Sequence, residues 1–599
     1  MNRSSIRRLR TASSDRTRAQ LELERLLAAT ELHPPGLSAS AILCVRRMRL
    51  PRPKPGLLRP PAGWEQSAQE HLEHLARTAA RPALGAVALQ AEVVLFADQA
   101  ELLACLALDW LAGDLASRWW WPSLYPGLQD LPLVAWQNVP EAIPAALEHL
   151  TRCGQALAFL RRIGSDSARR LRRAMQERYG LGGWLEPDWL SPEASPIPSA
   201  NPPLGRPTPP PWQNWLPQAR LENLELEPLL LWVLGLLLRR APSVVRSAGL
   251  AGDLQRWIAE EMRSSRASPQ TWPDARSRPI RPEATDLPAV RSQPEDTPLE
   301  RTEPPPTPRV ELLPWDSSAA ESTRRDGLEP LVYPSATSGF EPPLEPLAPP
   351  DVSAPEAEPW PRIIETEYGG LFFLLNLALA LELYGDFSRP LEPGLSLSPW
   401  DLLALLGQTW SGEGRQFDPL WPLLAELAGR TPQEPPGAGF DPPDQWRLPL
   451  EWLIAFPEPA KCRWGVRRGR LLAQHPGGFL LLDVRRKGDL SSQWEHEREA
   501  YRSLELGWAR APLKSPRGRL GRWCAWLFPY LEARLQRALG IENAGALVVC
   551  QPARVWMGAS DLEVGFSLET YPLEIRLAGL DRDPGWIPAA GRTVRFRFE

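Results

Sequence analysis

Two short clusters in the sequence combine residue types that could do chemistry, and the first is the segment DRDPGW. Asp581 and Asp583 are two residues apart, and Trp586 follows them. Paired carboxylates at the end of a strand can serve acid–base catalysis or bind a metal ion. The segment also fits a type II turn, with Pro584 at its second position and Gly585 at its third. We favour the turn, in which Asp583 bonds the backbone of its own loop.

The second cluster is the segment EHLEH at residues 70–74. On a helix, Glu70 and His74 share a face, so a metal site is one interpretation and a solvated helix face is the other. Structural zinc needs further ligands at a regular spacing, and the six cysteines and six histidines are scattered. The sequence also has no phosphate-binding loop, dinucleotide-binding fingerprint or nucleophile elbow. We therefore expect no catalytic residue, metal or cofactor, and an enzyme remains only an alternative.

A basic arm occupies residues 1–60, which hold 13 arginines and lysines against four acids. Clustered cations can bind the phosphates of nucleic acid. An amphipathic helix over residues 16–31, whose arginines meet acidic surfaces of a neighbour, also explains the pattern. We favour the helix, because no aromatic residues that could stack on bases are interleaved with the cations. A short buried strand is then expected at residues 41–45.

Three adjacent tryptophans, Trp119, Trp120 and Trp121, are the most unusual feature of the N-terminal half. Three neighbouring indoles cannot all face one core from one helix, so some are expected to touch another domain or a partner. The alternative is a buried corner that all three pack. Our candidate interaction residues are these tryptophans together with Asp581, Asp583 and Trp586.

Composition indicates a globular chain with no overall preference for polyanions. The 599 residues have a hydrophobic fraction of 43% and a net charge of −4. The six cysteines form no CxxC pair, which is typical of reduced thiols in the cytoplasm. The N-terminus has no secretory signal core, and no apolar run reaches the roughly 20 residues of a membrane span. We therefore expect a cytoplasmic protein without a membrane span.

Shifts in composition divide the chain into six parts. We expect a basic arm with a short α/β segment (1–60), a helical domain (61–190), a proline-rich linker (191–218), a helical segment (219–263), a disordered, acidic and proline-rich linker (264–361) and an α+β domain (362–599). The predicted fold class is thus multidomain. It has a mainly α N-terminal half, a long disordered linker and a C-terminal α+β domain with a mostly antiparallel sheet.

Periodicity predicts the elements within these parts. Helices are expected over residues 66–80, 98–112, 141–160, 371–383 and 517–539. Asp98 is a good N-cap for the second of them, Ser398 begins a further helix, and Pro529 should break the last. Strands are expected over residues 464–474, 478–485, 546–550, 555–557, 561–568 and 594–598, and from the alternation of Leu573, Ile575 and Leu577.

Four blocks of the sequence resemble a known family. They are PPGLSASAILCVRRMRLPRP (34–53), LFADQAELLACLALDWL (95–111), GGLFFLLNLALALELYGDF (369–387) and EIRLAGLDRDPGWIPAAGRTVRF (574–596). They are similar to uncharacterised proteins encoded in bacterial gene clusters for extracellular contractile injection systems, which are phage-tail-like particles. None of these blocks has a known chemical role in that family.

The resemblance implies a non-enzymatic structural component, or an assembly or adaptor factor, of such a particle. Its partners would be sheath, tube, baseplate or tape-measure-like proteins, and we expect protein partners rather than nucleic acid. Two alternatives come from the residues themselves. One is a nucleic-acid-binding regulator that uses the basic arm, and the other is an enzyme that uses Asp581 and Asp583.

Overall fold

The structure is a computed structural model. It describes residues 32–34, 36–50, 62–125, 131–182, 224–246, 362–384, 394–412, 417–504, 506–513 and 518–599, with a few single residues between them. Much of the basic arm, including most of the helix predicted over residues 16–31, lies outside the described residues. So do both predicted linkers, 191–218 and 264–361.

The N-terminal half is mainly helical, as the sequence predicts. Its helices are α2 (Ala62–Arg77), α3 (Gln99–Ala112), α4 (Trp120–Leu124), α5 (Leu131–Asn138), α6 (Ile143–Arg152), α7 (Ala156–Arg178) and α8 (Leu226–Arg240), with 3₁₀ turns η1 (Pro82–Leu84), η2 (Pro140–Ala142) and η5 (Val244–Arg246). Strands β1 (Ile42–Val45) and β2 (Val93–Phe96) pair antiparallel. Asp98 caps α3 as predicted, because its carboxylate accepts a hydrogen bond from the backbone N–H of Glu101.

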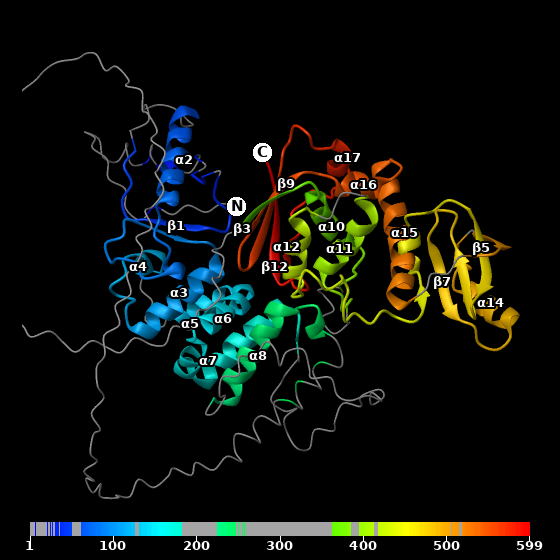
Figure 1. Cartoon of the computed structure of the whole chain (residues 1–599), viewed down its shortest axis with the longest axis horizontal. Coiled ribbons are helices and arrows are strands. Elements are labelled where there is room, and N and C mark those ends of the chain that lie inside the picture. Colours follow the sequence, from blue (N-terminus) through cyan, green and yellow to red (C-terminus); the bar gives the residue numbers. More distant parts are fainter. Residues whose placement is uncertain are drawn as a thin grey trace, which may run out of the picture. The chain divides into compact units, whose positions relative to one another are not determined.

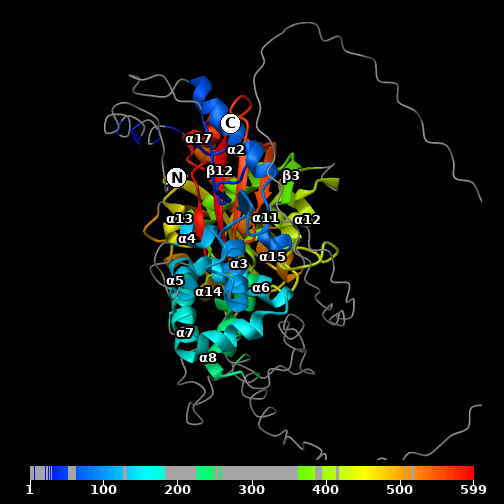
Figure 2. The same ribbon diagram turned by 90° about the vertical axis from the view of Figure 1, so that its left-hand side faces the viewer.

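Helix α8 shares the hydrophobic core of the helices before it. Leu230, Leu231 and Leu234 are fully buried, and α8 packs against α6 and α7. Figure 2 shows α7 and α8 side by side below α3. The helix predicted over residues 141–160 is split into α6 and α7. Gly154, which lies between them, has a φ of 67°, a left-handed conformation that glycine adopts at little cost.

Two five-stranded sheets form the framework of the C-terminal half (Figure 1). The first has the order β11-β12-β10-β9-β3 and consists of β3 (Arg362–Thr366), β9 (Ala553–Met557), β10 (Asp561–Phe566), β11 (Gly585–Ile587) and β12 (Arg592–Phe598). The second has the order β4-β7-β6-β5-β8 and consists of β4 (Trp446–Arg447), β5 (Ala460–Arg467), β6 (Arg470–Gln474), β7 (Leu480–Arg485) and β8 (Leu506–Arg510).

Both sheets are mixed, so the prediction of a mostly antiparallel sheet is wrong. Strand β10 is parallel to β12, and β5 is parallel to β8, while the other pairs are antiparallel. Alternation along a strand predicts which side chains are buried but not the direction of the neighbouring strand. Parallel neighbours need a crossover connection, and the chain supplies one through α17 before β12 and one through α14 before β8.

The remaining helices build the core around these sheets. They are η6 (Gly369–Phe373), α10 (Leu374–Ala380), α11 (Pro399–Trp410), α12 (Leu420–Leu427), α13 (Leu450–Leu453), α14 (Leu490–Glu499), α15 (Arg519–Leu539), α16 (Ala544–Val549) and α17 (Leu573–Leu577). The apolar segment predicted as one buried helix forms η6 and α10, and Leu371, Phe372 and Phe373 are fully buried. Figure 1 shows α15 beside the second sheet. Among the helices that the structure describes, none is long and apolar enough to cross a membrane.

Several local predictions in this half are wrong, among them the single strand over residues 464–474, which is divided between β5 and β6. Residues 573–577 form helix α17 rather than a strand, and Leu573 and Leu577 are exposed while Ile575 is buried. Residues 546–550 lie mostly in α16, because a short apolar run does not distinguish a buried helix from a buried strand. Pro529 does not break α15, whose neighbouring side chains Phe528 and Tyr530 are buried, so packing offsets the lost hydrogen bond.

Gly370 lies where the chain leaves no space for a side chain. A Cβ at this position would meet the carbonyl oxygen of Val548 at 1.8 Å. We expect Gly370→Ala to lower the free energy of unfolding by about 2 kcal/mol through overpacking. Gly63→Ala in α2 is the control, because nothing lies within 4 Å of its new methyl group. It should stabilise by about 0.5 kcal/mol, and similar urea denaturation midpoints for the two variants would contradict this account.

Candidate functional site

The three tryptophans singled out from the sequence pack inside the N-terminal half. Trp120 and Trp121 have no exposed surface, and Trp119 is half-buried. The indole of Trp119 donates to the carbonyl oxygen of Ala91 at 2.7 Å, and that of Trp121 donates to the Asp109 carboxylate at 2.7 Å. The structure therefore has the buried corner, the second of the two interpretations, and Trp120 and Trp121 present no surface to a partner.

The two aspartates of the DRDPGW segment have separate partners in the chain. Asp583 accepts a hydrogen bond from the backbone N–H of Phe596 at 2.6 Å, which fixes the loop to β12. Asp581 lies 3.8 Å from the guanidinium of Arg576. Gly585 has a φ of 71°, as the third position of a type II turn requires. Asp583 thus bonds the neighbouring strand rather than the backbone of its own loop, contrary to our expectation.

Trp586 connects the C-terminal half to the N-terminal half. Its indole donates to the carbonyl oxygen of Arg178 at 3.1 Å, and its ring meets that of Tyr179 edge-on with centroids 4.9 Å apart. The guanidinium of Arg178 lies over the indole, 5.4 Å from its centroid. Trp586 is therefore an interaction residue within the chain.

A buried pair of carboxylates also lies where the two halves meet. One oxygen of Asp98 caps α3, and the other accepts a hydrogen bond from the backbone N–H of Ser560 at 2.9 Å. Asp561, the first residue of β10, is 5% exposed, and its Oδ1 accepts no hydrogen bond within the described part of the chain. Burial and the charge of Asp98 raise the pKa of Asp561 to about 7. Two buried carboxyl groups thus lie where the halves meet, and Asp561 binds a proton more readily than an exposed aspartate does.

Among the described residues, no group of three or more histidine, cysteine, aspartate or glutamate side chains is arranged so that it could hold a metal ion. This includes the EHLEH segment in α2. The described part of the basic arm is limited to residues 32–34 and 36–50 and a few single positions, so the structure leaves the nucleic-acid alternative untested. A further concentration of charge lies at one end of the second sheet.

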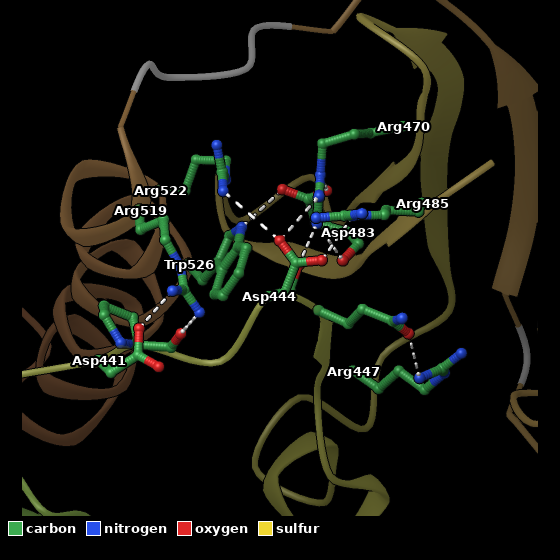
Figure 3. A network of polar contacts seen from close by, with 11 residues as sticks. Asp441, Asp444, Arg447, Arg470, Asp483, Arg485, Arg519, Arg522 and Trp526 are labelled. Atoms are coloured by element: carbon green, nitrogen blue, oxygen red, sulfur yellow. Dashed lines mark hydrogen bonds and ion pairs between the residues drawn. The ribbon is translucent and has the colours of Figure 1, made fainter. Parts of the chain in front are cut away.

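A buried ion pair stands at the centre of that end. Asp483 on β7 has no exposed surface, and its carboxylate pairs with the guanidinium of Arg470 on β6. The second carboxylate oxygen accepts a hydrogen bond from the indole of Trp526 on α15 at 2.7 Å. Figure 3 shows the three side chains converging from two strands and a helix. The pair therefore fixes α15 to the sheet.

Asp444, in the loop before β4, extends this network towards the surface. Its carboxylate lies 2.6 Å from Arg485, 3.7 Å from Arg470 and 3.7 Å from Arg522, which surround it in Figure 3. Partial burial raises the pKa of Asp444, but the hydrogen bond and the charges of these arginines outweigh burial and lower it. One carboxylate thus holds arginines from β6, β7 and α15 in place.

The strand directions bring further cations to the same end of the sheet. Strands β5, β7 and β8 finish there, and β6 begins there, because β5 and β8 are parallel and β6 and β7 alternate with them. Six exposed cations result, and we call them the basic end: Arg467, Arg468, Arg485, Arg486, Lys487 and Arg510. Asp489, at this end, is occupied as the N-cap of α14, where it accepts a hydrogen bond from Ser492.

The basic end can bind groups with several carboxylate or phosphate oxygens. Guanidinium groups match such oxyanions with two parallel hydrogen bonds. Sequence reasoning missed this site because its cations come from three segments, 467–468, 485–487 and 510, that are separated by buried strands. The only local signal is a short basic doublet or triplet at the end of an apolar run.

No family model, curated protein or solved structure matches this chain. The geometry and charge of the basic end are therefore the basis for a functional proposal.

Proposed function

We propose that this chain is a non-enzymatic component or assembly factor of a bacterial contractile injection particle and acts in the cytoplasm as an adaptor. The proposal joins the resemblance of four sequence blocks with one structural observation. That observation is the basic end, where six cations are exposed on a rigid sheet. The adaptor binds other particle proteins, among which we name sheath, tube, baseplate and tape-measure-like proteins.

The geometry of the basic end supports binding rather than chemistry. Three of its cations are anchored by interactions within the chain, among them Arg485 on Asp444 and Arg510 over the ring of Trp464. Arg467 also donates to the backbone oxygen of Leu513 at 3.2 Å. Anchored side chains lose less conformational entropy on binding than free ones, so they favour a stable interface.

Affinity capture of the tagged full chain from its native cell tests this function. We expect particle proteins to be recovered, and to be recovered equally after nuclease treatment. The triple variant Arg468→Glu, Arg486→Glu and Lys487→Glu should reduce their recovery about tenfold, because opposed charges across an interface become like charges. All three positions are exposed, so the fold should persist.

The matched control carries the same change of charge elsewhere on the surface. Arg170→Glu, Arg173→Glu and Arg582→Glu are at exposed positions in α7 and before β11. This variant should capture particle proteins as well as the native chain does. Equal recovery with both triple variants would contradict binding through the basic end. If only nucleic acid and its binding proteins are recovered, and if nuclease treatment removes them, the result would favour the nucleic-acid-binding regulator instead.

A further inference from the structure

Strand β8 forms an outer edge of the second sheet and pairs only with β5 among the described strands. The backbone N–H of Ala511 donates to the carbonyl oxygen of Trp464 on β5. Because successive residues of a strand direct their backbone groups to opposite sides, Gly507 and Ala509 also face β5. The N–H and C=O groups of Trp508 and Arg510 therefore point away from the sheet and can pair with another strand.

Apart from the charge of Arg510, this edge lacks, among the described residues, several of the devices that usually prevent strand addition. Proteins protect edges with proline, bulges, inward charges or a covering segment. The five residues of β8 contain no proline, and their register with β5 is regular. Gly507, Ala509 and Arg510 are exposed. An extended chain could therefore approach the edge without displacing a described element.

The charge around this edge specifies what would bind. Strands β5 and β8 together contain four cations and no acid: Lys461, Arg463, Arg467 and Arg510. Lys461 and Arg463 are exposed and lie opposite Gly507 and Ala509 in the register. An added strand would lie about 10 Å from β5, and the long side chain of Lys461 can reach it across Gly507. The guanidinium of Arg463 donates to Gln474 on β6 at 3.1 Å and would have to turn towards the added strand.

Two exposed carboxylates of α14 form ion pairs with other residues. Glu495 lies 3.4 Å from Arg498, and Glu499 lies 2.9 Å from Arg502. The cations of β5 and β8 therefore keep their positive potential. A chain with acidic side chains at alternate positions would place them next to Lys461 and Arg463.

The aromatic residues of this region favour a peptide over nucleic acid. One face of Trp464 is stacked on Trp494 with centroids 4.4 Å apart, and the guanidinium of Arg510 lies 5.6 Å from the Trp464 centroid. Trp508 contacts Trp494 and Tyr501. These indoles are thus engaged within the chain, whereas single-stranded nucleic acid needs free aromatic faces on which bases stack.

We propose that the outer edge of β8 binds an extended, acidic segment of a partner protein by strand addition. The main-chain groups of Trp508 and Arg510 supply hydrogen bonds, and Lys461 and Arg463 select for acidic side chains. This inference rests on the proposed adaptor function and specifies how the partner docks beside the basic end.

The test uses a fluorescent peptide of about ten residues, the length of a long strand, in which glutamate alternates with valine. Its binding to the full chain is followed by fluorescence anisotropy. Arg510→Gln removes the charge but keeps the outward N–H, and Arg510→Pro removes both. Proline is tolerated on an edge strand where the N–H faces solvent, so both variants should fold. We expect the Kd of Arg510→Pro to be about tenfold above that of Arg510→Gln.

Hydrogen exchange supplies a second measurement. The amides of residues 506–510 should exchange more slowly when the peptide is bound. Equal Kd values for the two variants, with unchanged exchange, would overturn strand addition. Binding of a single-stranded oligonucleotide in preference to the acidic peptide would overturn the choice of partner. If Arg510→Pro captures particle proteins normally while the triple basic-end variant does not, the adaptor function holds and this inference fails.

Discussion

Replacing Asp483 by asparagine should lower the free energy of unfolding by about 3 to 5 kcal/mol, the usual loss when one partner of a buried ion pair is removed. Asp483 has no exposed surface, and it neutralises Arg470, whose side chain is 9% exposed. Asparagine has the same shape and can still accept a hydrogen bond from Trp526. The loss, measured by urea denaturation, therefore reports on Arg470 when only Asp444, 3.7 Å away, still opposes its charge.

Two controls distinguish this explanation from a loss of packing. Glu499→Gln removes a carboxylate from an ion pair whose side chains are 63% and 80% exposed, so it should change stability by less than about 1 kcal/mol. Adding Arg470→Gln to Asp483→Asn should restore part of the lost stability, because no buried charge remains. If the double variant is less stable by the full sum of the two single losses, the ion-pair account is wrong.

Replacing Asp561 by asparagine should flatten the dependence of stability on pH. The pKa of Asp561 is raised from 3.8 to about 7, so between these values the folded chain holds a proton that the unfolded chain has released. Stability from this group is fully present below about pH 4 and falls as pH rises towards 7, by up to about 1.4 kcal/mol per pH unit. Above the folded pKa the curve is level again, and asparagine cannot titrate.

Besides burial, the polar neighbours of Asp561 set its pKa and therefore the pH range over which stability changes. Asp98, at the start of α3, raises the pKa of Asp561, and Ser40, Arg592 and Arg595 lower it. Burial lowers the pKa of Arg592 to about 9, so this group stays mostly charged up to pH 8 and adds little slope of its own. Urea titrations of the native chain and Asp561→Asn between about pH 4 and pH 8 give the difference. Asp166→Asn, at a side chain that is 93% exposed, is the control, and parallel curves for the native chain and Asp561→Asn would contradict the raised pKa of Asp561.

Local chemistry predicted several elements correctly. Asp98 followed by Glu101 predicted the start of α3, because capping depends only on residues within one helical turn. The alternation of Leu562, Val564 and Phe566 predicted β10, since the side chains on one face of a strand recur every two residues. The mainly helical N-terminal half follows from apolar residues that recur at helical spacing, which is also a local pattern.

Sequence patterns failed where tertiary contacts outweigh local preference. Leu573, Ile575 and Leu577 alternate like a strand, but a five-residue segment is too short to distinguish the two periods, and only Ile575 is buried in α17. Pro529 should break a helix, but buried neighbours hold α15 together. The direction of β8 relative to β5 depends on the path of the chain through α14, which no pattern within β8 records.

The sequence by itself determined the cap of α3, strand β10 and the position of the apolar segments, because each depends on a few neighbouring residues. Only the tertiary structure decided which charges meet. Asp98 reaches Ser560 across 462 positions, and Asp483 meets Trp526 across 43. The six cations of the basic end come together through strand order and direction. Such contacts arise from the packing of whole elements, and their residues carry no local pattern that distinguishes them from other surface arginines or buried aspartates.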